Sequence, residues 1–150
     1  MRWLRIALAI AIALLGGFAL YGHYVANPRV AEDIRTNPDG PRARETMLLT
    51  LPSGRELPVN YLLEADRVFV GADGPWWRDL RDGGRVAMLI RGRTLTGEAR
   101  VILDDPAHTR DVFSRLRPTA PSWLPMWLNG RLIEIEVPEK KQNFDPRFAE

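Results

Sequence analysis

The sequence predicts a mainly β protein, a small antiparallel barrel of six strands with two or three short helices, preceded by one N-terminal transmembrane helix. Three observations support this fold class. Between residues 46 and 137, short segments of strand character are separated by turn residues. Two segments in the same region carry the signals of short helices. The first 26 residues contain an apolar run long enough to span a bilayer.

The six strands are predicted from their apolar residues and from the turns between them. The clearest pattern is in residues 94–100, where Leu95, Gly97 and Ala99 lie on one face and polar residues lie on the other. A period of two is typical of a half-buried strand. Turns at 52–55 and 64–66 bound other strands. The remaining strands are predicted at residues 46–51, 57–63, 67–70, 85–90 and 133–137.

Two short helices are predicted between the strands. Asp73 is a candidate N-cap for the first helix, with Pro75 near its first helical position, and the glycines at 83–84 end it. Asp105 and Pro106 begin the second helix. Because the strands are joined by hairpins and short helices, a closed barrel is the favoured architecture, and closure also removes exposed strand edges.

The N-terminal segment has two interpretations. The run 6–26 follows Arg2 and Arg5 and has His23 as its only strongly polar side chain. At 1.5 Å per residue it spans roughly 30 Å, which is one hydrocarbon core. A cleaved signal peptide is the alternative, but cleavage after Ala26 places Tyr24 where a small residue is required. The sequence therefore favours an uncleaved anchor in contact with membrane lipid.

Composition divides the chain into four parts. They are a transmembrane anchor at 1–26, a polar stalk at 27–45, a barrel domain at 46–137 and a charged tail at 138–150. The arginines on the two sides of the anchor nearly balance, and we expect a single-pass protein with its folded domain outside the cytoplasm. The chain has no cysteine, so disulfides give no further indication of the compartment.

Several kinds of site are disfavoured by the composition. The net charge is only +2 and no basic block contains interleaved aromatic residues, so nucleic-acid binding is not expected. Two histidines and no cysteine make a dedicated metal site improbable. A Ser-His-Asp hydrolase would depend on His108 alone, and no residue is assigned a catalytic role. A bound redox cofactor would explain this shortage of catalytic side chains.

One segment carries a resemblance to a known family. Residues 68–80 read as a strand, a glycine-containing loop and then Pro75, Trp77 and Leu80 at the spacing Pro-x-Trp-x-x-Leu. This arrangement resembles the deazaflavin-dependent (F420H2-dependent) nitroreductase and quinone reductase family. The resemblance covers 46–137 and implies the split β-barrel of flavin-reductase-like proteins. The hairpin within 85–100 and the helix start at 104–106 also resemble that family.

The resemblance implies where a cofactor would bind. The family has a Gly-Arg-Lys-Ser/Thr-Gly loop that meets the anionic tail of its cofactor. Gly54 and Arg55 match its first two positions, whereas Glu56 replaces the lysine and the loop is shorter. F420 or FMN is therefore the expected cofactor, while a haem or no cofactor stays open. The implied cofactor-binding residues are Gly54, Arg55, Trp77, Arg78 and Arg93.

A second aromatic segment has several interpretations. Residues 121–128 contain Trp123 and Trp127 between prolines. They read as a loop that plugs the barrel end, a lid over a planar ligand, or a contact with the lipid interface. In the family that the chain resembles, this segment contributes to the substrate pocket, which implies Trp123 and Trp127 as pocket residues.

Two functions remain as hypotheses. The first is a membrane-anchored oxidoreductase that uses a flavin or deazaflavin-type cofactor to reduce a lipophilic small-molecule acceptor such as a quinone. The second is a cofactor-free split barrel that acts as a membrane-tethered binding or assembly module. Glu56 favours the second hypothesis, whereas Trp77 and the segment 123–127 favour the first. Split barrels often dimerise, so a homodimer is also expected.

Overall fold

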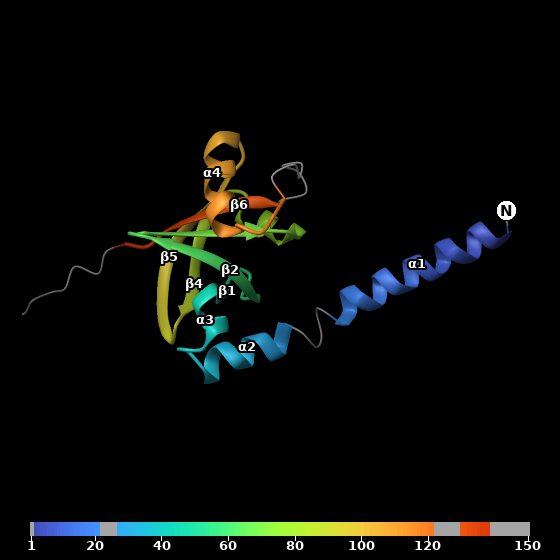
Figure 1. Cartoon of the computed structure of the whole chain (residues 1–150). Coiled ribbons are helices and arrows are strands. Elements are labelled where there is room, and N and C mark those ends of the chain that lie inside the picture. The colour runs from blue at the N-terminus through green and yellow to red at the C-terminus, as the bar shows by residue number, and fades with distance from the viewer. Residues whose placement is uncertain (1, 22–26, 122–129, 139–150) are drawn as a thin grey trace, which may run out of the picture.

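The computed structural model describes residues 2–21, 27–121 and 130–138, and it contains a closed antiparallel barrel with helices around it (Figure 1). Around the barrel, the strands follow the order β1-β2-β3-β6-β5-β4, and β4 pairs with β1 to close it. The predicted mainly β, six-stranded barrel is confirmed. The strands are β1 (Thr46–Thr50), β2 (Glu56–Glu64), β3 (Arg67–Ala72), β4 (Gly84–Ile90), β5 (Arg93–Ile102) and β6 (Arg131–Glu136).

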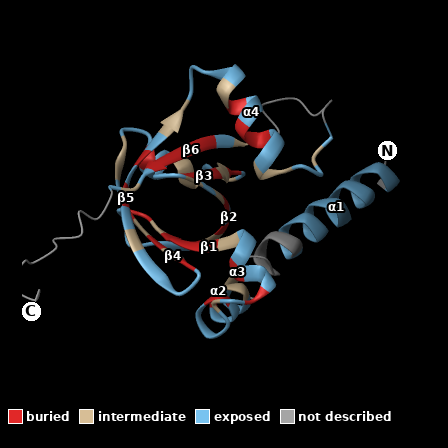
Figure 2. Cartoon of the chain, turned by 60° about the vertical axis from the view of Figure 1, so that its left-hand side comes forward, coloured by how far each residue is buried: buried red, intermediate tan, exposed pale blue. Residues whose placement is uncertain are grey.

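The barrel interior is filled by alternate residues of all six strands. Met47 and Leu49 of β1, Val68 and Val70 of β3 and Ile135 of β6 are among the residues buried there. Figure 2 shows the buried positions following the strands. Burial of such side chains contributes about 25 cal/mol per Å² of apolar surface. Alternation of this kind predicted the strands at 94–100 and 133–137, whereas the other strands were predicted from apolar residues and the turns between them.

The two ends of the barrel carry different elements. Every paired strand is antiparallel, so β3 and β5 run in the same direction. We call one end of the barrel the η2 end. The strands β3 and β5 finish there, and it carries the 3₁₀ helix η2 (Pro75–Leu80). The opposite end, which we name the hairpin end, carries the β2–β3 and β4–β5 hairpins.

The helix η2 packs against the η2 end of the core. Leu80 is fully buried, and Trp76 and Trp77 are partly buried against the same cluster. The predicted N-cap is wrong, because Gly74 occupies the cap position and makes no side-chain capping bond. The Asp73 carboxylate is instead held by Arg117.

The helix α4 (Pro106–Leu116) covers the outer face of β3 and β6. Val112 and Phe113 pack there against Phe69 and Leu132. Its predicted start is confirmed, since the Asp105 carboxylate accepts a hydrogen bond of 2.9 Å from the His108 backbone N–H. An N-cap of this kind stabilises a helix by about 1 kcal/mol.

Residues 27–45 differ from the predicted polar stalk. They form α2 (Asn27–Thr36) and α3 (Pro41–Glu45). Ile34 of α2 is fully buried and packs with Leu48 and Leu89 on the outer face of β1 and β4. The helix α2 docks because burial of its apolar residues on the sheet compensates for the weak helix preference of a polar sequence.

The predicted transmembrane anchor is wrong. In the described part of the chain, no helix is long and apolar enough to cross a membrane. The helix α1 runs from Arg2 to Tyr21 and carries two arginines, Arg2 and Arg5, near its start. The predicted run ended at Ala26, which lies outside the described residues. The prediction of a single-pass membrane protein is therefore wrong for the described residues.

Candidate functional site

The η2 end brings an aromatic ring and two guanidinium groups together. The half-buried ring of Trp77 packs against the core from η2. The Arg78 guanidinium carbon lies 5.8 Å from the centroid of this ring, and that of Arg131, at the start of β6, lies 5.8 Å from it as well. Cations at this distance are attracted to the electron-rich face of an indole by about 0.5–1 kcal/mol when exposed.

The charges of these two arginines are not balanced by nearby acids. Within residues 2–21, 27–121 and 130–138, neither Arg78 nor Arg131 forms an ion pair. Arg117 differs, because its guanidinium lies 2.8 Å from the Asp73 carboxylate. Trp77 with Arg78 and Arg131 therefore forms a flat apolar surface beside net positive charge, which suits a planar anion.

The β1–β2 hairpin lies beside η2. The Ser53 hydroxyl donates a hydrogen bond of 3.0 Å to the Asp79 carboxylate of η2. Gly54 has φ +81°, and its α-carbon faces open space. A left-handed residue in a tight turn explains the glycine. The predicted cofactor residue Gly54 is thus at the same barrel end as Trp77 and Arg78.

Arg55 is exposed and lines a pocket of about 440 Å³ between the β1–β2 hairpin and α2. Glu56, the residue that departs from the family pattern, is paired with Arg35 of α2. The negative charge of Glu56 is therefore balanced by Arg35 of the same chain. Arg55, in contrast, forms no ion pair with a described residue.

Arg93 does not join the other predicted cofactor residues. It begins β5 at the turn of the β4–β5 hairpin, whereas Trp77 follows the end of β3. Because β3 and β5 run in the same direction, Arg93 lies at the hairpin end and Trp77 at the η2 end. The predicted pocket residues Trp123 and Trp127 lie outside the described residues.

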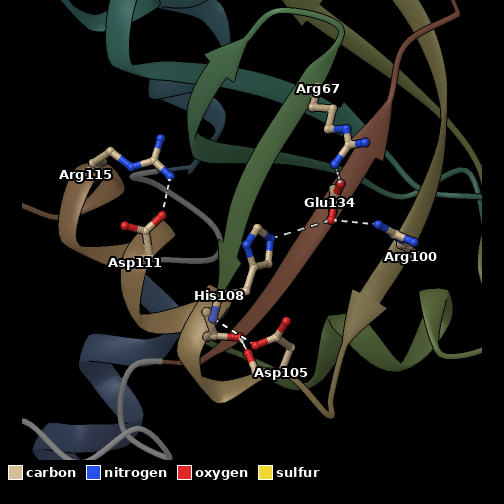
Figure 3. A network of polar contacts seen from close by, with 8 residues as sticks. Arg67, Arg100, Asp105, His108, Asp111, Arg115 and Glu134 are labelled. Carbon is tan, nitrogen blue, oxygen red and sulfur yellow. Dashed lines mark hydrogen bonds and ion pairs between the residues drawn. The ribbon is translucent and has the colours of Figure 1, made fainter.

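A buried carboxylate under α4 was not recognised from the sequence. Glu134 of β6 is only 4% exposed, and its two oxygens lie 2.7 Å from an Arg67 nitrogen and 3.0 Å from an Arg100 nitrogen. The His108 Nε2 atom of α4 lies 3.7 Å from the same carboxylate. Figure 3 shows the three side chains pointing at Glu134 from β3, β5 and α4. We name these four residues the Glu134 cluster.

The Glu134 cluster joins the barrel wall to α4. Arg67 and Arg100 come from the strands on either side of β6, and His108 packs edge-on to Phe69 with ring centroids 6.0 Å apart. In the sequence analysis, the alternation of residues 133–137 was not used to predict that Glu134 is buried. A signal was present in the sequence, because Glu134 shares a strand face with apolar Leu132.

A second ion-pair group lies further along α4. Arg115 donates hydrogen bonds to Glu64 of β2 and to Asp111 one turn earlier (Figure 3 shows the Asp111 bond). These bonds raise the pKa of the Arg115 guanidinium above its ordinary value, so it carries its charge throughout the accessible pH range. Arg115 is exposed, so water screens these ion pairs and they contribute little to stability.

A larger pocket of about 860 Å³ opens at the hairpin end. Leu63 of β2, Leu95 of β5 and Val137 after β6 form its apolar lining. These residues extend the inward-facing rows of their strands beyond the packed core. Asp66, Thr94 and Thr96 supply polar groups at its rim. Its volume lies in the range of small-molecule and cofactor pockets.

Comparisons with known proteins identify the fold. No family model matches the chain, and no curated protein matches it. The solved structure of a Listeria innocua protein, provisionally assigned as a pyridoxamine 5'-phosphate oxidase, has 14% identity and a TM-score of 0.53 and covers 63% of this chain and 85% of its own. A Corynebacterium diphtheriae protein of unknown function has 19% identity and a TM-score of 0.40, covering 64% and 80%.

The first of these likenesses shows the fold class. The chain is a split β-barrel protein with the same fold as the Listeria innocua structure. The predicted split barrel is confirmed in this respect. At 14% identity the likeness extends to the fold alone. Membership of the deazaflavin-dependent reductase family is not shown.

Proposed function

We propose that this protein is an oxidoreductase that holds a phosphate-bearing flavin-type cofactor, FMN or F420, at the η2 end of the barrel. The observation that carries the proposal is that two arginines, Arg78 and Arg131, lie beside the Trp77 ring and form no ion pair with a described carboxylate. The split-barrel fold supports the same class of function.

The residues present fit such a cofactor. A flat indole gives a ring system an apolar contact, and an offset aromatic pair adds about 0.5–1.5 kcal/mol beyond area burial. Arg78 and Arg131 provide donors for an anionic group. A bound flavin would supply hydride or electron transfer, and the protein would supply orientation and exclusion of water. The acceptor in this proposal is lipophilic, such as a quinone, with Trp123 and Trp127 as its pocket residues.

A variant of Arg55 tests whether this residue binds the anionic tail of the cofactor. We expect Arg55→Ala to weaken cofactor binding by about 1.5–3 kcal/mol, the contribution of a hydrogen bond to a charged group. Titration of the purified protein with FMN and with F420, followed by fluorescence, measures this. Arg93→Ala is the matched control, since it removes an exposed arginine at the opposite barrel end. Equal losses in both variants would argue for a general charge effect and against a phosphate contact at Arg55.

A cofactor-free barrel that binds another molecule is the second candidate. The observation in its favour is that Trp76 and Trp77 both pack against the core, as residues of a structural plug would. The absorption spectrum of the purified protein separates the two candidates. A flavin or deazaflavin band, and quenching of tryptophan fluorescence on titration with either cofactor, is expected for the oxidoreductase. A spectrum without a cofactor band, together with titrations of FMN, F420 and haem that leave the fluorescence unchanged, would support the cofactor-free barrel.

A further inference from the structure

The first half of β5 has a partner on one side only. β5 pairs with β4 from Arg93 to Ala99, but its pairing with β6 covers only Glu98 to Ile102. Within the part of the chain that the structure describes, no strand pairs with residues 93–97 on the side that faces away from β4. We name this side of residues 93–97 the open edge of β5.

The turn of the hairpin determines which backbone groups face the open edge. Arg91 and Gly92 both have positive φ, at 46° and 73°, and they join Ile90 directly to Arg93. A two-residue turn of this kind closes on a hydrogen-bonded pair. Since hydrogen bonding alternates along an antiparallel ladder, the N–H and C=O groups of Thr94 and Thr96 point away from β4. Both are exposed, and neither has a hydrogen-bond partner at the open edge among the described residues.

Pro138 explains why β6 does not cover the open edge. Glu136 is opposite Glu98, so a straight continuation of β6 would bring Pro138 opposite Thr96. Proline has no N–H to donate to a ladder. The preceding residue, Val137, donates its N–H to the Asp66 carbonyl oxygen of the β2–β3 hairpin at 2.8 Å, on the side of β6 that faces β3. Among the described residues the β5–β6 ladder ends at Glu98 and Glu136, and no strand pairs with Thr94 or Thr96 on this side.

The 860 Å³ pocket lies along this open edge. Thr94 and Thr96 line it together with apolar Leu63, which is 48% exposed, and with Val137. The Asp66 carboxylate lies at the rim, and the described residues provide it with no ion pair. The pocket thus combines ladder groups, an apolar floor and an unneutralised negative charge.

We infer that the open edge of β5 binds an extended peptide from another protein, in which an apolar side chain is flanked by a lysine or arginine. The backbone of the peptide would pair with Thr94 and Thr96 and so add a strand to the sheet. Its apolar side chain would enter the pocket between Leu63 and Val137. Its basic side chain would pair with Asp66.

Charge favours a foreign peptide over a second copy of this chain. Two copies joined through β5 would bring their Asp66 carboxylates to the same interface. The exposed Glu136, which forms no ion pair with another described residue, lies nearby. Like charges at an interface are repelled. A basic peptide neutralises them instead.

The test uses the full chain and a blocked heptapeptide of alternating lysine and valine with a fluorescent label. We expect saturable binding by anisotropy, and at least a tenfold loss of affinity in Thr96→Pro. Proline at this position removes an N–H that β4 does not use, so the β4–β5 hairpin should stay paired. Thr96→Val keeps the N–H and is the matched control, with affinity within threefold of the parent chain. Asp66→Asn should weaken binding severalfold, most clearly at low salt.

A second test changes the peptide instead of the protein, so it does not depend on whether a variant folds. The same heptapeptide with N-methylated backbone amides should bind the parent chain at least tenfold more weakly, because it cannot complete the ladder. Full affinity of the N-methylated peptide, or no saturable binding of the parent peptide, would overturn the inference. Concentration-dependent dimerisation that is abolished by Thr96→Pro, with no peptide binding, would assign the open edge to a second copy instead.

Discussion

Replacing Glu134 with alanine is expected to lower the free energy of unfolding by about 2–3 kcal/mol, since hydrogen bonds to a buried carboxylate contribute about 1.5–3 kcal/mol. The substitution removes the bonds to Arg67 and Arg100 and leaves a hole beneath α4. Those arginines are 49% and 65% exposed, so water solvates them again and the loss stays below that of a fully buried pair. Urea unfolding followed by circular dichroism measures the change.

Two further variants show whether the position of Glu134 under α4 causes this loss. Glu136→Ala removes an exposed carboxylate from the same strand and should change stability by less than about 0.5 kcal/mol. Glu134→Gln keeps the shape of the side chain and should lose less than the alanine variant. Faster amide exchange in α4 of the Glu134→Ala variant is expected, because His108 loses its contact with the barrel. Equal losses for Glu134→Ala and Glu136→Ala would contradict the structural role assigned to the Glu134 cluster.

Replacing Gly97 with alanine is expected to destabilise the barrel by about 2–3 kcal/mol, within the range for overpacking a close contact. A Cβ atom at this position would lie 2.6 Å from the Glu136 carbonyl oxygen and 2.7 Å from the Ile135 side chain. The oxygen belongs to the backbone of β6, so β6 would have to move away from β5. Because these strands meet over only five residue pairs, displacement of one pair weakens a large part of their ladder.

Gly54→Ala is the control for the Gly97 variant. Gly54 also lies in the barrel, but in the β1–β2 turn, where an added Cβ meets no atom within 4 Å. Its φ of +81° makes alanine strained there, at a cost of about 1–2 kcal/mol. We expect a smaller loss of stability for Gly54→Ala than for Gly97→Ala in thermal unfolding. The reverse order would show that contact between β5 and β6 is looser than this structure indicates.

Most of the barrel could be predicted from local sequence. Residues 94–100 alternate because each strand residue points to the opposite face from its neighbours, and Gly97 and Ala99 are indeed buried. The start of α4 at Asp105 was equally local, since the cap bond joins residues three apart. The N-terminal helix was predicted as well, but its assignment as a membrane span was wrong, since no helix of the described residues is long and apolar enough to cross a membrane.

The candidate site was predicted only in part. Gly54, Trp77 and Arg78 do lie at one end of the barrel, because β1 to β3 are consecutive antiparallel strands and η2 follows β3 directly. Arg93 was grouped with them but lies at the other end, since the direction of β5 decides where its first residue falls. Arg131 was not considered, because only the return of β6 to the side of β3 brings it to Trp77.

The sequence by itself determined the strands, the turns and the helix start, because these depend on the preferences of neighbouring residues. Only the tertiary structure decided which side chains meet across the barrel. Burial of Glu134 depends on the docking of α4, and the open edge of β5 depends on where Pro138 falls against Thr96. Contacts between residues distant in the chain are set by strand order and register, which no local pattern specifies.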